Sequence, residues 1–416
     1  MPPLFVRWHP LVGPELAVPA ALGVGLWILL PRVLGLPSVW FLAALVLFAW
    51  AFAVTLAMQS GHARTFSRCC QLEGYGAALT VVLDRNDDYF FDVPRIEQLG
   101  PQTFATRFPT IVRTDEQSLS LHSLTHPPGA PLLEWAMWRL TDRSELAVAL
   151  LMALIGALGA LPARAIAREL SGEDATRTAA VLFACAPGVL LLSATSADAI
   201  FMTVTGVAVA ALVREPRSDA WAGATGAVTA VGLCFTWGAL ALGPIGLGVG
   251  LLALRDGADT RIRILRRGAI AAAGLVAGWL AIRLLTGIDL VADFLPTATR
   301  QVSFISYRRS YWYWLAGNVV AFLFVMGVAN AASLVATTVA RWRERRPGME
   351  TVLLATLALA SVSSVFRGET DHNWLFFMPL AIAMAASAVT EDSLRGADVS
   401  GLGQAGLTEA LFYTGW

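Results

Sequence analysis

Acidic side chains gather in one polar stretch early in the chain, the sequence LDRNDDYFFDV at residues 83–93. Asp87 and Asp88 are adjacent and precede aromatic residues, a setting that can raise a carboxyl pKa and so suits a general base. Paired carboxylates can also bind a divalent cation such as Mg²⁺ or Mn²⁺. We therefore consider Asp87 and Asp88 candidates for a general base or for the ligands of a divalent cation. The alternative is a solvated acidic turn in which Asp84 or Asp92 caps a helix.

A second motif, HSLTHPPG at residues 122–129, precedes an apolar segment. The two prolines bias the residue before them away from helix, so His126 should lie at a rigid entry to that segment. Histidine can donate to a phosphate or carry a proton near neutral pH, and we predict that His122 and His126 contact substrate. The alternative is an ordinary proline-capped helix start with a histidine at the membrane interface.

A single carboxylate, Asp198, interrupts the apolar sequence SATSADAIF. A carboxylate inside or at the edge of a membrane segment is energetically costly, which favours a functional role. We predict that Asp198 contacts substrate, with helix capping at a turn as the alternative.

Arginines and aromatic residues occur together near residue 310. The guanidinium group offers a planar fork for phosphate oxygens, so a cluster of arginines suits a lipid phosphate or pyrophosphate. The alternative is an aromatic belt with snorkelling arginines, which we favour for most of the aromatic residues but not for Arg309. The candidate contacts are Arg300, Arg308, Arg309, Tyr311 and Trp314.

Near the end of the chain, RGETDHNWLFFMPL at residues 367–380 packs four titratable groups into one short turn before an apolar segment. Solubility alone does not explain that density. We predict that Arg367, Glu369 and His372 contact substrate, whereas an ion-paired polar turn is the alternative, above all for Asp371.

The composition identifies the environment in which these residues must work. Of 416 residues, 56% are hydrophobic and 14% are charged, against roughly a quarter charged in a soluble domain, so a soluble enzyme is excluded. The formal net charge of zero gives no indication of a nucleic-acid partner. Metal-ligand spacings of the HExxH or paired CxxC kind, a Walker loop and a GxSxG elbow are absent, and no cofactor beyond a divalent cation is predicted.

Apolar windows long enough to cross a bilayer recur along the whole chain. They predict one all-α, polytopic membrane domain over residues 1–416 with nine to eleven spans, because two windows are short. The windows are 16–36, 38–58, 144–163, 178–192, 199–213, 219–236, 238–254, 268–286, 312–338, 349–366 and 374–390.

Short arginine-rich connections predict the orientation. They occur at residues 164–177, 214–217, 255–267 and 341–346 and should face the cytoplasm of a plasma-membrane protein. The acidic and HPPG motifs then lie in an extracytoplasmic loop, 59–143, with helices on the membrane surface. The loop 287–311 and the turn at 367–373 lie on the same outer face, and residues 391–416 form a tail or a short final helix.

Taken together, the acidic stretch, THPPG, SATSAD, RSYWYWLAGN and RGETDHNWLFFMP resemble, in order and topological side, actinobacterial membrane proteins of the GT-C glycosyltransferase superfamily. The resemblance implies a multi-helical enzyme that transfers a sugar from a polyprenyl-phosphate donor to a cell-envelope glycan, lipid or protein. It implies Asp87 or Asp88 as base and Arg309 as a phosphate contact. The family leads us to expect an arginine within the stretch that here reads 369–373, which leaves Arg367 or His372 as substitutes.

The implied reaction is a single displacement that inverts the anomeric centre, in which a carboxylate deprotonates the acceptor hydroxyl and the lipid phosphate leaves. A transporter or flippase of a lipid-linked or anionic substrate is the first alternative. It ranks lower because the polar residues gather at one face rather than at broken helices near the midplane. A polymerase or ligase of lipid-linked glycans is the second alternative.

Overall fold

A computed structural model gives the fold. It describes residues 7–8, 10, 12–59, 89–194, 196–306, 309–363, 365, 367–368 and 370–413. Four candidate site residues lie outside the described residues: Asp87, Asp88, Arg308 and Glu369.

The described part of the chain is helical apart from one pair of two-residue strands, which confirms the predicted all-α class. The first half contains α1 (Ala17–Leu34), α2 (Ser38–Gln59), α5 (Val93–Leu99), α6 (Pro101–Thr114), α7 (Leu121–Thr125), α8 (Gly129–Leu140), α9 (Glu145–Ala157), α10 (Ala160–Ser171), α11 (Asp174–Ala184) and α12 (Pro187–Leu192). The second half contains α13 (Asp198–Leu212), α14 (Asp219–Leu233), α15 (Leu242–Arg255), α16 (Arg261–Thr286), α17 (Leu290–Ser306), α18 (Tyr311–Met326), α19 (Val328–Arg343), α20 (Met349–Val362), α21 (Thr370–Asn373), α22 (Met378–Ala385) and α23 (Glu391–Leu411).

Within the described ranges, five helical stretches are long and apolar enough to cross a membrane. They are Pro14–Leu34, Ser38–Gln59, Glu145–Ser171, Trp237–Arg255 and Arg261–Thr286. The number rises to six if the bent pair α18 and α19 is one span. Counted by helix length and composition, the described residues therefore contain fewer spans than the nine to eleven predicted. The number is lower because some predicted spans are interrupted. Pro187 separates α11 from α12, and several apolar helices are shorter than a full crossing. The chain is nevertheless a multi-pass membrane protein.

The bend between α18 and α19 measures 113° and falls at Gly327. Gly327 has a φ of 96°, a left-handed conformation that residues with a Cβ rarely adopt. Glycine therefore permits the chain to turn here, where the sequence predicted one continuous span over 312–338.

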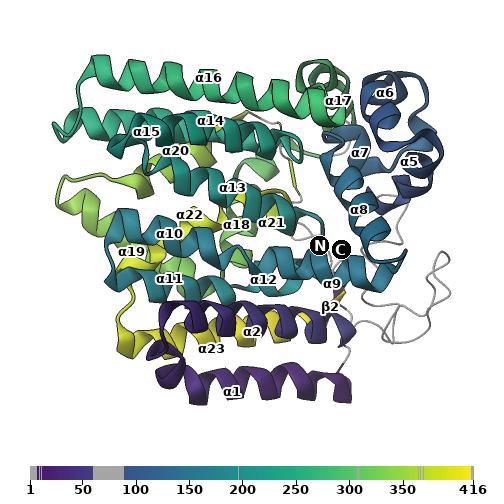
Figure 1. Ribbon diagram of the computed structural model, residues 1–416. Coiled ribbons are helices and arrows are strands. Elements are labelled where there is room, and N and C mark those ends of the chain that lie inside the picture. Colours follow the sequence, from purple (N-terminus) through teal and green to yellow (C-terminus); the bar gives the residue numbers. More distant parts are fainter. Residues whose placement is uncertain are drawn as a thin grey trace.

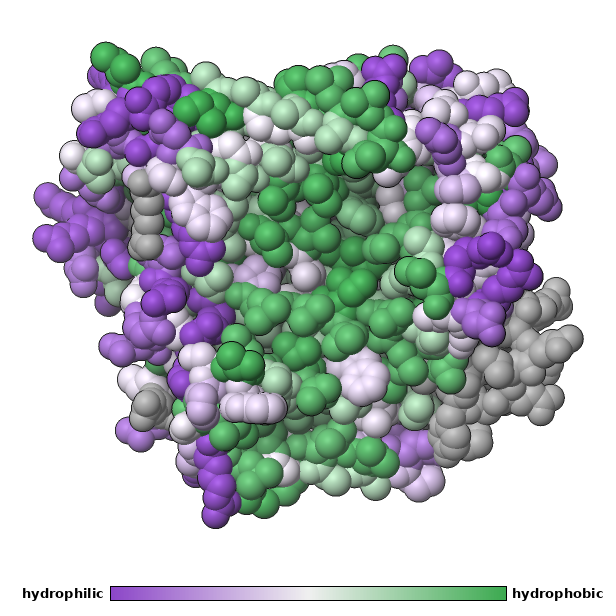
Figure 2. Space-filling view, in the orientation of Figure 1, coloured by the Kyte–Doolittle hydropathy of each residue, from purple (hydrophilic) through white to green (hydrophobic). Residues whose placement is uncertain are grey.

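The long helices run roughly side by side across the view in Figure 1, and α5 to α8 gather at one end of them. Figure 2 shows an apolar band across the middle of the visible face, with polar margins at the two ends of the helices. This distribution is the one expected for a bundle whose helices cross the hydrocarbon layer.

The C-terminal segment differs from its prediction. Residues 391–411 form the 21-residue helix α23, which packs against α1, α2, α11, α12 and α19 rather than lying apart as a tail or short helix. After it, the strand Phe412–Tyr413 pairs antiparallel with Arg7–Trp8, so the two ends of the described chain lie together (Figure 1).

Candidate functional site

Three of the five histidines of the chain meet at one end of the bundle. His122 lies on α7, His126 follows that helix, and His372 lies on α21. The ring centroid of His122 is 6.4 Å from those of both His126 and His372. Tyr89 joins them, with its ring 5.5 Å from His122 and 6.0 Å from His126. The HPPG motif and the late RGETDHN motif, 250 residues apart, thus share one site.

Asp198 belongs to the same site. Its Oδ2 atom is 2.8 Å from Nδ1 of His372, and the hydroxyl of Ser196 donates to the same oxygen at 2.8 Å. Asp198 is the first residue of α13, where the partial positive charge of the helix start favours a carboxylate. Asp198 thus lies in the first turn of α13, where no side-chain capping hydrogen bond is made, and its carboxylate faces a histidine from another part of the chain.

His126 is held in a defined orientation. Its Nδ1 lies 3.0 Å from the hydroxyl of Thr125 and 3.2 Å from the carbonyl oxygen of His122, so two groups of α7 fix the orientation of the ring. Its ring stacks on Phe201 at a centroid distance of 5.9 Å. Burial lowers the pKa of His126 to about 4, so the ring is uncharged near neutral pH. The contact of His126 with substrate stays a prediction.

The HPPG turn is fixed against the end of α14. The backbone N–H of Gly129 donates to the carbonyl of Cys234 at 2.8 Å, and a Cβ on Gly129 would lie 2.2 Å from that oxygen. Only glycine allows so close an approach of the two backbones. The motif therefore needs glycine after the prolines, and its contact sets the position of His126.

Asp92 is a supporting residue, because it holds the helix that carries His122. Its side chain is fully buried, and its Oδ1 accepts the backbone N–H of Ser120 at 2.8 Å. Ser120 is the N-cap of α7, whose side chain in turn accepts the N–H of Ser123. Burial raises the pKa of Asp92 to about 7. Asp92 stands at the N-cap position of α5, as the alternative interpretation predicted, but its side chain makes no capping hydrogen bond there and instead holds the start of the helix that carries His122.

Two arginines meet beside the turn that leads into α21. Arg309 donates to the backbone carbonyl of Arg367 at 2.7 Å, and Arg367 donates to that of Arg309 at 3.2 Å. The guanidinium of Arg367 also lies over the ring of Tyr311, 5.5 Å from its centroid. The N–H of Gly368 donates to the side chain of Asn318, which ties this turn to α18.

The remaining candidate site residues, Arg300 and Trp314, do not join the histidines. Arg300 pairs with Glu116 and donates to the carbonyl of Val112, so it fastens α17 to α6 rather than joining the histidines. Trp314 is buried inside the bundle, whereas Trp312 is 79% exposed, so the predicted belt describes Trp312 and not Trp314.

An apolar cavity of about 290 Å³ begins at Thr125 and His126. It continues between the start of α15, α17 and α20, where Phe294, Leu359 and Phe376 are among its lining residues. An elongated apolar group could lie there with its polar end at the histidines.

No group of three or more His, Cys, Asp or Glu side chains within the described residues is arranged to hold a metal ion. Because Asp87 and Asp88 lie outside those residues, a divalent cation at this pair stays a prediction.

Comparison with known proteins gives one sequence match and several structural ones. The family described as dolichyl-phosphate-mannose-protein mannosyltransferase matches residues 125–282, which begin at the HPPG motif and include Asp198. No curated protein sequence matches the chain.

Among solved structures, ArnT from Cupriavidus metallidurans in the apo state is similar with a TM-score of 0.46 and 16% identity, over 71% of this chain and 56% of that one. ArnT bound to undecaprenyl phosphate gives 0.45 and 16%, over 68% and 54%. The Archaeoglobus fulgidus oligosaccharyltransferase in complex with Zn and sulfate gives 0.42 and 14%, over 87% and 53%. The chain spans little more than half the length of each.

Proposed function

We propose that the protein is a membrane glycosyltransferase of the GT-C superfamily, which transfers a sugar from a polyprenyl-phosphate donor to a glycan, lipid or protein acceptor of the cell envelope. The observation that carries the proposal is the meeting of His122, His126, His372, Asp198 and Tyr89 beside an apolar cavity. The matched family acts with a lipid-phosphate sugar, which agrees with this arrangement.

The geometry of α13 supports an extracytoplasmic site. This helix starts at Asp198 and ends before the basic connection at 214–217, and its 15 residues rise about 22 Å at 1.5 Å per residue. The site therefore lies most of a membrane thickness from that connection. Because basic connections face the cytoplasm, we propose that the sugar is transferred at the extracytoplasmic face.

The two ends of the donor have different requirements. A polyprenyl chain needs an apolar surface, which the cavity between α15, α17 and α20 offers. A phosphate needs cationic donors, and we assign this role to Arg309 and Arg367. Their reciprocal hydrogen bonds hold the two side chains together beside the turn that leads into α21. The sugar would then lie against the neutral His126 and its neighbours.

For the chemical step we assign the base to Asp87 or Asp88. Asp88 directly precedes Tyr89 in the sequence, and the ring of Tyr89 contacts His122 and His126. The carboxylate takes the proton of the acceptor hydroxyl while that oxygen bonds to the anomeric carbon. The bond from this carbon to the lipid phosphate breaks, the phosphate leaves with the electron pair, and the anomeric configuration inverts.

A transfer assay on purified protein in lipid tests the proposal. Radiolabelled polyprenyl-phosphate sugars are offered with membrane-extract acceptors to the wild type and to the double variant Asp87→Asn/Asp88→Asn. We expect transfer by the wild type and its loss in the double variant, with unchanged thermal unfolding. Asp115→Asn is the matched control, because Asp115 is an exposed carboxylate of the same segment that pairs with Arg95. If labelled lipid crosses the vesicle membrane and no sugar is transferred, the protein is a transporter and the proposal fails.

A further inference from the structure

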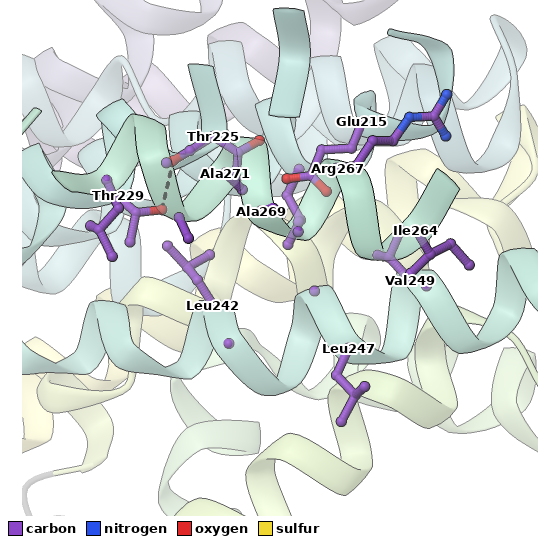
Figure 3. A pocket seen from close by; sticks show the side chains of 18 of the residues that line it. Glu215, Thr225, Thr229, Leu242, Leu247, Val249, Ile264, Arg267, Ala269 and Ala271 are labelled. Carbon is purple, nitrogen blue, oxygen red and sulfur yellow. Dashed lines mark hydrogen bonds between the residues drawn. The ribbon is translucent and has the colours of Figure 1, made fainter. Parts of the chain in front are cut away.

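A second large cavity lies between α14, α15 and α16, away from the histidines. Its volume is about 680 Å³, and two of its walls are the stretches Trp237–Arg255 and Arg261–Thr286, both apolar enough to span a membrane. Figure 3 shows Glu215 and Arg267 on one side of it and Leu242 and Leu247 on another. The function proposed above makes no use of this cavity.

The cavity has an apolar length and a polar end. Along α15 its lining runs from Leu242 to Ala253, about 17 Å at 1.5 Å per residue, which exceeds the roughly 15 Å of one hydrocarbon leaflet. Leucine, glycine and alanine side chains supply most of that length, where water would find few partners. Of the charged lining residues, Glu215 lies in the short turn after α13, Asp259 in the connection between α15 and α16, and Arg267 in the second turn of α16.

The margin beside the polar end is rich in arginine, although two of the three charged lining residues, Glu215 and Asp259, are acidic. Residues 255–267, which include the end of α15, the connection 256–260 and the start of α16, contain five arginines and two aspartates, a net charge of +3. The Arg267 guanidinium is fixed by ion pairs to Asp259 and Asp219, and its side chain is only 14% exposed. Basic pockets between spanning helices on the cytoplasmic side attract anionic lipid headgroups.

We propose that this cavity binds one acyl chain of an anionic phospholipid from the cytoplasmic leaflet, with the phosphate at the basic connection 255–267. The apolar length, the opening between two spanning helices and the excess of arginine at one end all match this ligand. The charged end of this cavity lies at the opposite end of α13 from Asp198, whereas its apolar end shares Leu240 with the cavity beside His126.

Glycines in the cavity wall allow it to be filled without disturbing the backbone. A Cβ on Gly243 or on Gly268 would meet no atom within 4 Å, so leucine at either position extends into the cavity. Leucine also favours helix over glycine, so these variants should fold. Gly406→Leu is the matched control, because Gly406 also meets nothing within 4 Å and lines a cavity of about 730 Å³ that has no charged lining residue.

The experiment adds phosphatidylglycerol or phosphatidylcholine to delipidated full-length protein and counts the retained lipids by native mass spectrometry. We expect one phosphatidylglycerol retained per chain, at least tenfold weaker retention in Gly243→Leu and Gly268→Leu, and no change in Gly406→Leu. Equal retention by wild type and the two cavity variants would overturn the proposed site. Equal retention of phosphatidylcholine would overturn the proposed anionic selectivity.

Discussion

Replacing Asp92 by Asn should change how the stability of the protein depends on pH. The folded state raises the pKa of this carboxyl from 3.8 to about 7, so between those values the folded protein binds more protons than the unfolded chain. Stability from this group is complete below the unfolded pKa and is lost as pH rises towards the folded pKa. A shift of about three units corresponds to about 4 kcal/mol in total, of which about 3 kcal/mol falls between pH 5 and pH 7.

Asparagine keeps an oxygen that can accept the N–H of Ser120 but does not titrate. The assay is thermal unfolding in detergent at several pH values, and the readout is the stability of Asp92→Asn minus that of the wild type. This difference should increase by about 3 kcal/mol from pH 5 to pH 7. The titration of His126, which acts in the opposite direction, is common to both proteins and cancels. A difference that stays constant or decreases would refute the argument that Asp92 is protonated in the folded protein. The exposed Asp115→Asn variant controls for loss of one carboxylate.

Two further substitutions test separate contacts. Gly129→Ala should lower stability by about 1–3 kcal/mol, because its Cβ would lie 2.2 Å from the Cys234 carbonyl oxygen. Thermal unfolding measures this, and stability equal to that of Gly268→Ala, where nothing lies within 4 Å, would contradict it. Arg300→Gln should change stability by less than about 1 kcal/mol, because its ion pair with Glu116 is substantially exposed, and should leave sugar transfer within twofold of wild type. A large loss of transfer would mean that Arg300 contacts the donor.

The sequence identified His122, His126, Asp198 and His372, but neither Tyr89 nor how these residues pair. Asp198 was predicted because a carboxylate in an apolar segment is costly, His126 because two prolines fix the turn that carries it, and His372 because titratable groups are dense around it. The contact of Asp198 with His372 joins residues 174 positions apart, and no local pattern carries that information. Asp92 was assigned to the same acidic group as its neighbours, because burial by α7 cannot be read from one segment.

The helices likewise include features that the sequence predicted and features that it did not. Hydropathy predicted where apolar segments occur, because composition decides what can lie in lipid. It did not predict the break at Pro187 or the bend at Gly327, since in a bundle neighbouring helices can satisfy the backbone groups that such breaks expose. The packing of α23 was also missed, because its sequence mixes charged residues with a narrow apolar face.

The most direct test of the account is the rate of sugar transfer from labelled polyprenyl-phosphate sugars by Asp198→Asn and His372→Ala, with Arg300→Gln as control. If the paired Asp198 and His372 contact the donor or hold the groups that do, both variants should lose transfer by about 100-fold or more while Arg300→Gln remains active. Transfer within twofold of wild type in both variants, in protein that unfolds at the wild-type temperature, would contradict the assignment of this end of the bundle as the active site.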